Sequence, residues 1–135
     1  MRIVLDTNVV VSGLLTAFGP PARIVDLVSS GDLTLVVDDR ILSEYEDVHA
    51  RRQFKFDAWA VEAFLELADG AEHVIGAPLP FALPDADDEP FLEVAIAGAV
   101  DALVTGNEKH FLVRGGGLAI PVLSPRRLLD RLAGR

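Results

Sequence analysis

The sequence has no cysteine, only one methionine, one tryptophan and one tyrosine, and no long apolar run. Without cysteine the chain forms neither disulfides nor thiolate metal sites, so metal ligands must be carboxylate, imidazole, amide or hydroxyl groups, which suit hard cations. No apolar run reaches the length of about eighteen residues that a membrane helix needs, and the first residues do not resemble a secretory signal. We therefore expect a cytoplasmic protein that does not enter a membrane.

Positive charge is also scarce, with 12 Lys and Arg against 21 Asp and Glu and a net charge of −9. This balance argues against a protein that holds nucleic acid by a uniformly basic surface. The charge is unevenly distributed, because residues 109–135 carry a net +5 and residues 1–108 carry −14. The basic segment could position an anionic substrate on an acidic body, or it could equally be a solvated final helix.

Half of the 135 residues are apolar, and their spacing predicts one domain, residues 1–135, in which strands and helices alternate. Strands are predicted at 2–5, 33–37, 73–76, 101–107 and 120–123. Helices are predicted after Thr7 or Asn8, from the prolines at 20–21 to Ser30, from Asp38 or Asp39 to about Ala50, at 57–68, after Asp88 and after Ser124. Inward positions of the later helices are expected to include Trp59, Leu92, Ala95, Ile96 and Ala99. The alternation indicates a parallel sheet covered on both faces, in which ligands gather beyond the carboxyl ends of the strands.

Two acidic residues occupy positions where an ordinary fold gains little from a charge. Asp6 follows the first buried strand in "RIVLDTNVVVSG", although an aspartate there can be only a cap or turn residue. Glu44, in "ILSEYEDV", lies at the margin of the helical stripe formed by Ile41, Tyr45 and Val48. A glutamate at that margin can also simply reach water.

A third acidic stretch is "DADDEP" at 85–90, which could be no more than a solvated turn at a helix start. Asp88 is the candidate within it, because it directly precedes the helix and its side chain should point back toward the strand ends. Two carboxylates about 5 Å apart repel by roughly 3 kcal/mol at an effective dielectric near 20. Three converging acids would therefore stay partly protonated unless a divalent cation such as Mg²⁺ or Mn²⁺ joined them. A cation held in this way suits phosphodiester hydrolysis.

Four ordered motifs, "VLDTN", "ILSEYEDV", "DADDEPFLEVAIAG" and "DALVTGNEKHF", resemble PIN-domain proteins, in particular the group described as toxins of toxin–antitoxin pairs. The resemblance covers residues 3 to about 125. It implies a three-layer α/β/α fold with a central parallel sheet and a Mg²⁺- or Mn²⁺-dependent ribonuclease site. Carried over position by position, it implies that the metal is held by Asp6, Glu44, Asp88 and Asn107, with Asp85 as an outer ligand and Thr7, Asn8 and Thr105 as supporting residues.

Asn107 departs from the pattern of the family, because many relatives have aspartate at this position. The change leaves three formal negative charges instead of four, which should weaken a second metal more than the first. The resemblance with this departure therefore predicts catalysis with one metal ion.

Candidate substrate contacts surround the last motif and follow the third helix. His110 could be a general base or a substrate contact, or only a surface histidine at a helix start. The basic candidates for phosphate contacts are Arg51, Arg52, Lys55, Lys109, Arg114, Arg126 and Arg127. An acidic antitoxin segment could equally bind them.

The leading hypothesis is an endoribonuclease that acts as a toxin, cleaves RNA, is neutralised by a cognate antitoxin and forms a homodimer. The alternative is a PIN-like module that binds RNA or protein without cleaving. A phosphatase with Asp6 as nucleophile is disfavoured, because such enzymes commonly carry a second aspartate where Asn8 stands. A dinucleotide-binding fold is disfavoured because no glycine-rich turn follows the first strand.

Overall fold

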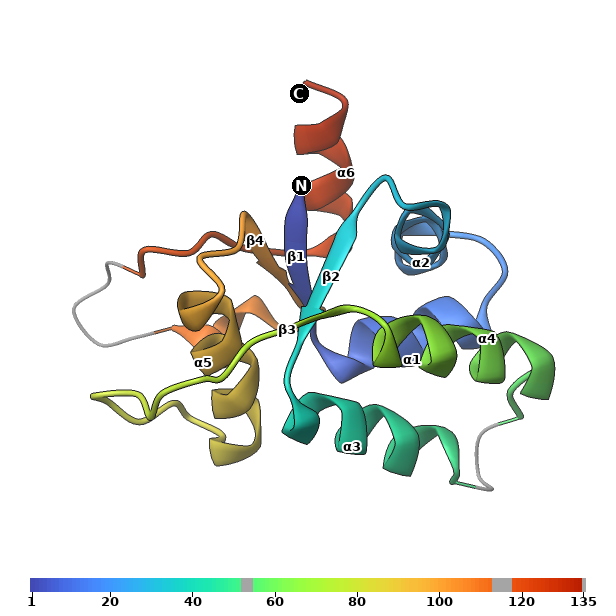
Figure 1. Ribbon diagram of the computed structural model, residues 1–135. Coiled ribbons are helices and arrows are strands. Elements are labelled where there is room, and N and C mark those ends of the chain that lie inside the picture. Colours follow the sequence, from blue (N-terminus) through green and yellow to red (C-terminus); the bar gives the residue numbers. More distant parts are fainter. Residues whose placement is uncertain (52–54, 113–117, 135) are drawn as a thin grey trace.

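The computed structural model describes residues 1–51, 55–112 and 118–134. Five strands and six α-helices alternate along these ranges (Figure 1). The strands are β1 (Arg2–Leu5), β2 (Thr34–Val37), β3 (Glu72–His73), β4 (Ala102–Val104) and β5 (Val122–Leu123). The α-helices are α1 (Thr7–Leu15), α2 (Pro20–Ser30), α3 (Asp39–His49), α4 (Ala58–Asp69), α5 (Glu89–Ala97) and α6 (Pro125–Leu132). Two short 3₁₀ helices, η1 (Ala86–Asp88) and η2 (Glu108–Phe111), precede α5 and follow β4.

The central sheet is parallel throughout, with the strand order β3-β2-β1-β4-β5. The order reverses at β1, since the chain first adds β2 and β3 on one side and later β4 and β5 on the other. Helix α5 packs on β1, β2 and β4, while α6 packs on β4, β5 and α2. In Figure 1, α5 and α2 lie on opposite sides of the strands. The predicted three-layer α/β/α fold is confirmed.

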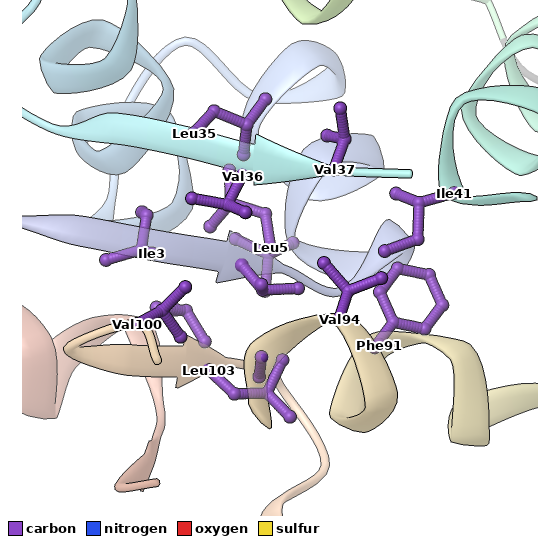
Figure 2. Packing of buried hydrophobic residues seen from close by; sticks show 14 of the residues in the cluster. Ile3, Leu5, Leu35, Val36, Val37, Ile41, Phe91, Val94, Val100 and Leu103 are labelled. Atoms are coloured by element: carbon purple, nitrogen blue, oxygen red, sulfur yellow. The ribbon is translucent and has the colours of Figure 1, made fainter. Parts of the chain in front are cut away.

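The core lies between the sheet and its helices, and its centre is β1, whose Ile3, Val4 and Leu5 are fully buried. Figure 2 shows side chains of β1 and β2 meeting Phe91 and Val94 of α5 and Ile41 of α3. Burial of such β-branched and leucine side chains supplies the main favourable free energy of folding. It also fixes the strand ends, because slipping a strand by one residue would turn its apolar side chains away from their partners.

Several element boundaries and inward positions differ from the sequence prediction. Strand β3 has two residues and precedes most of the predicted 73–76, and β4 is shorter than 101–107. Trp59 is 79% exposed, because α4 directs Phe64 and Ala68 inward instead. Ile96 is 45% exposed, and Ala99 lies beyond the end of α5 with a positive φ of 46°.

The starts of α3, α4 and α6 follow local capping chemistry, whereas the N-cap residues of α1, α2 and α5 make no side-chain capping hydrogen bond. The side chains of Asp38 and Ser124 accept hydrogen bonds from the N–H groups of Ile41 and Arg127, as N-caps do. Helix α1 instead begins at Thr7 with Asp6 in the N-cap position, so the predicted cap at Thr7 or Asn8 is wrong. The Asp6 side chain makes no capping hydrogen bond, which leaves its carboxylate free for other partners.

Among the described residues no single helix is long and apolar enough to span a membrane. Helices α1 and α2 meet the length and composition requirement only as a pair bent by 97°.

Candidate active site

Asp6 directly follows β1, the central strand of the sheet, and directly precedes α1 (Figure 1). It therefore lies at the carboxyl-terminal end of the strands, where α3 also starts after β2. Its backbone N–H donates to the carbonyl of Val104 at 2.9 Å, which continues the pairing between β1 and β4. The residue is only 6% exposed. Its Oδ2 accepts a hydrogen bond of 2.7 Å from the hydroxyl of Thr105, which is fully buried. The carboxylate is thus held at a fixed place on the sheet edge.

Two further hydrogen bonds hold the segment after β4, and one of them ties it to the segment after β1. The N–H of Asn107 donates to the Thr105 Oγ1 at 3.0 Å, so this hydroxyl bridges Asp6 and the Asn107 backbone. The N–H of Gly106 donates to the Asn8 Oδ1 at 3.2 Å. Asn8 and Thr105 thus connect the segments that follow β1 and β4, while Asn107 is exposed.

Glu44 reaches the same edge from α3, and the neighbouring Tyr45 anchors this helix to β1. The Tyr45 hydroxyl is fully buried and donates to the carbonyl of Leu5 at 2.6 Å. Glu44 is half-buried, as its position at the margin of the stripe predicts. The nearby Thr7 hydroxyl lowers the pKa of the Glu44 carboxyl, although it makes no hydrogen bond of standard geometry. The sequence prediction missed Tyr45, although a phenol on an inward helix face needs a buried acceptor.

Asp88 closes the site from the start of α5 and faces η2. Its Oδ2 lies 3.2 Å from the His110 Nδ1, so His110 stands at the site and is more than a remote surface histidine. Asp85, which is exposed, accepts the N–H of Asp87 at 2.9 Å and thereby caps the turn that carries Asp88. Asp88 itself occupies the N-cap position of α5 but makes no capping hydrogen bond.

Electrostatics show that these carboxyl groups act on one another. Burial is the largest cause that raises the pKa of Asp6, of Glu44 and of Asp88. The charge of Asp6 raises the pKa of Glu44 and of Asp88 further, and Asp85 raises the pKa of Asp6 and of Asp88. Hydrogen bonds from Thr105 and from the Thr7 backbone oppose the rise in the Asp6 pKa. Among the described residues, no lysine or arginine forms an ion pair with Asp6, Glu44 or Asp88.

The donor chemistry of this group, here called the acidic site (Asp6, Glu44, Asp88 and Asn107), fits a hard divalent cation. The Thr7 Oγ1 is buried without a hydrogen bond of standard geometry, and the buried Asp88 Oδ2 has only the His110 ring nearby, at 3.2 Å. Within the described ranges, however, no three Asp, Glu or His side chains stand close enough together to hold an ion directly. The arrangement therefore suits a cation that keeps several of its waters, as Mg²⁺ commonly does.

The basic residues predicted to contact phosphate are less tightly grouped. Lys109 is an exposed residue of η2, two positions after Asn107. Arg51 instead follows the C-terminal end of α3. Arg127 forms an ion pair with Glu108 at 2.5 Å, so it is not a free cation at the rim. Lys55 and Arg126 are exposed, and Arg52 and Arg114 lie outside the described residues.

Comparison with protein families now identifies the class of this molecule. A family model described as a PIN domain matches residues 2–109, a range that contains all four residues of the acidic site. The chain therefore belongs to the PIN-domain family. PIN domains are generally nucleases, and they typically use divalent metals. No curated protein and no solved structure matches the chain.

Proposed function

We propose that this protein is a Mg²⁺- or Mn²⁺-dependent endoribonuclease. The observation that carries the proposal is the convergence of three carboxyl groups, at the centre of the sheet edge, whose pKa values are raised by burial and by one another's charge. Carboxyl groups that share a site and have raised pKa values are candidates for catalytic or metal-binding centres. Such an arrangement weakens the metal-free fold and becomes favourable when a divalent cation joins it.

In this proposal Asp6 and Asp88 bind the cation, and Glu44 and Asn107 contribute directly or through water. A bound Mg²⁺ or Mn²⁺ ion lowers the pKa of water and offsets negative charge on a phosphoryl group. The Thr105 hydrogen bond keeps Asp6 in one orientation. Glu44, whose pKa is raised by burial, is the candidate general base, since a raised carboxyl pKa brings the group closer to the working pH.

The proposal is tested by RNA cleavage with Mn²⁺ in the wild type and in Asp6→Asn, Asp88→Asn and Glu44→Gln. Each substitution is expected to reduce the cleavage rate by on the order of 100-fold, the lower end of what general acid–base groups contribute. Glu46→Gln is the matched control, because Glu46 is an exposed glutamate on the same helix as Glu44. Equal rates in the wild type and all three site variants would remove the proposal.

We further propose that this ribonuclease is the toxin of a toxin–antitoxin pair, works in the cytoplasm as a homodimer and is neutralised by its antitoxin. The four ordered motifs that resemble such toxins support this role. Induced expression of the wild type should then arrest growth, and Asp6→Asn should not. If the wild type cleaves RNA but growth continues at matched protein levels, the toxin role is contradicted and the ribonuclease proposal is not.

A second candidate function is a PIN-like module that binds RNA or protein without cleaving. Two points favour it: residue 107 is an uncharged asparagine where the family resemblance implies an acidic position, and no three acids of the described chain are placed to hold an ion directly. Calorimetric titration with Mn²⁺ separates the two candidates. Binding at millimolar or lower concentration supports the ribonuclease, and its absence supports the binding module.

A further inference from the structure

Glu108 joins η2, the short helix next to the acidic site, to the start of α6. Its Oε1 accepts the backbone N–H of Ser124 at 3.1 Å, and its Oε2 accepts a hydrogen bond from the Arg127 Nη1 at 2.5 Å. Glu108 and Ser124 are 16 residues apart, and residues 113–117 between them lie outside the described part of the chain. One carboxylate thus connects two segments through both of its oxygens.

The start of α6 explains why a carboxylate is needed there. In a capping box, the N-cap serine accepts the N–H of the third helical residue, and a glutamate at that third position accepts the N–H of the serine. Here Ser124 accepts the Arg127 N–H at 3.2 Å, but the third helical residue is an arginine. Glu108 supplies the missing carboxylate from another segment. It also offsets a positive charge in the first turn, where the helix dipole disfavours cations.

Residues on both sides of Glu108 reach the acidic site. The backbone N–H of Asn107, directly before Glu108, is bonded to the Thr105 hydroxyl that also holds Asp6. Two residues after Glu108, the His110 ring lies 3.2 Å from Asp88. Asn107 and His110 therefore reach the site from the two ends of a segment whose outer side is tied down by Glu108.

We propose that Glu108 is a positioning residue that sets Asn107 and His110 against Asp6 and Asp88 by fixing η2 to α6. This inference rests on the proposed function and deepens it by naming a residue outside the implied ligand set. Glu108 acts through the backbone and contacts neither substrate nor cation. Because its ion pair is largely exposed, the pair adds little to global stability, and its loss should be felt mainly at the site.

The test compares Glu108→Ala, Glu108→Gln and Arg127→Met with a matched control, Glu72→Gln. Glu72 pairs with Arg2 in another partly exposed Glu–Arg pair, which joins distant segments far from the acidic site. Two readouts are used: backbone amide NMR shifts of residues 105–110 in the metal-free protein, and the Mn²⁺ concentration that gives half-maximal RNA cleavage. The KM for RNA at saturating Mn²⁺ is the reference value, because it should not change when only the position of the metal site is altered.

In Glu108→Ala we expect shifted amides at Gly106, Asn107 and His110 and an increase of about tenfold in the half-maximal Mn²⁺ concentration, the lower end for residues that orient metal ligands. Glu108→Gln should show a smaller change, because its amide oxygen can still accept the Ser124 N–H. Arg127→Met should also show a smaller change, and Glu72→Gln should behave as the wild type.

Amide shifts confined to Glu108 and residues 124–127, with an unchanged Mn²⁺ requirement, would overturn the positioning role. So would a loss of thermal stability in Glu108→Ala with no selective change in Glu108→Gln, since this indicates a purely structural contact. If the wild type cleaves no RNA with Mn²⁺, the proposed function fails. The metal-free amide shifts then still decide whether Glu108 fixes Asn107 and His110.

Discussion

Two groups of acidic side chains lie near the carboxyl-terminal ends of the strands, and they differ in whether an arginine pairs with them. The Arg40 cluster consists of Asp38, which follows β2, Glu93 of α5, and Arg40 between them. Asp38 and Glu93 are 8% and 9% exposed, close to the 6% of Asp6. Arg40 bonds to Asp38 at 2.8 Å and to Glu93 at 2.6 Å. The remaining oxygens accept the N–H groups of Ile41 and Leu79.

The acidic site has a carboxylate as deeply buried as those of the Arg40 cluster, but the chain gives it no arginine or lysine partner within the described ranges. Burial and mutual repulsion raise the pKa of its acids, and the nearby His110 only partly opposes this rise for Asp6 and Asp88. Burial of an acid therefore does not by itself mark function. The informative difference is the compensating charge: Arg40 pairs with both acids of its cluster, whereas among the described residues the acidic site has only the exposed His110, 3.2 Å from Asp88.

The largest expected effect comes from removing the positive charge of the Arg40 cluster. Arg40→Met should lower the free energy of unfolding by about 3 kcal/mol, because it leaves two buried carboxylates unpaired. This is the lower end of the usual range, since the Arg40 side chain is 48% exposed. Urea denaturation at neutral pH measures the change, and Arg23→Met on the exposed face of α2 is the control. A change as small as that of the control would mean that Arg40 does not compensate these acids.

The next largest effect comes from adding Mn²⁺, which would supply positive charge to the acidic site. At a free Mn²⁺ concentration about 100 times Kd, the unfolding free energy of the wild type should rise by about 2.7 kcal/mol. Asp6→Asn should lose most of this gain, whereas Arg40→Met should keep it despite its lower starting stability. Thermal melts with Mn²⁺ and with a chelator measure the difference. An equal gain in Asp6→Asn would place the bound ion elsewhere.

A smaller effect removes a repelling charge instead of adding an attracting one. In metal-free protein at neutral pH, Asp6→Asn should raise the unfolding free energy by on the order of 1 kcal/mol, the usual scale of a single substitution. The amide oxygen can still accept the Thr105 hydroxyl, so the main change is the loss of an uncompensated buried charge. Asp38→Asn in the Arg40 cluster should have the opposite sign in the same denaturation experiment. Destabilisation by both substitutions would make the two groups equivalent.

The smallest expected effect is a pH dependence. The pKa values of Asp6, Glu44 and Asp88 are raised above the ordinary values of 3.8 for Asp and 4.5 for Glu. The folded protein thus binds these protons more tightly than the unfolded chain, so the stabilisation is present at low pH and is lost as the pH rises through the raised values. The stability gained by metal-free Asp6→Asn over the wild type should therefore grow from acid to neutral pH. A constant difference would mean that Asp6 has an ordinary pKa.

The sequence predicted the sheet, the order of its elements and the acids at its edge because these depend on local patterns. Apolar runs such as 2–5 and 33–37 identify strands, and Asp6 and Asp38 each follow one. The pattern did not distinguish these two aspartates, since Arg40 serves both Asp38 and a glutamate 53 residues away. Compensation of charge is a tertiary property, and it becomes visible only when α3 and α5 are placed together.

The errors have the same origin. Trp59 fits an inward stripe by spacing, but the neighbours of α4 leave that side open. Ile96 fits the inward stripe of α5, but the helix ends one residue later and the chain turns away. The pairing of Arg127 with Glu108 could not be predicted either, because it follows from the packing of η2 against the start of α6, and the predicted phosphate contact of Arg127 stays a prediction.

The order of the strands has a consequence for synthesis of the protein. Asp6 directly follows β1, but its partner Thr105 is 99 residues further along the chain and is synthesised later. A nascent chain that ends before β4 has only one side of the central strand paired, and the acids cannot yet be held in place. If the protein cleaves RNA, the translating ribosome and its message are therefore not exposed to a finished active site until β4 and the residues after it have been synthesised.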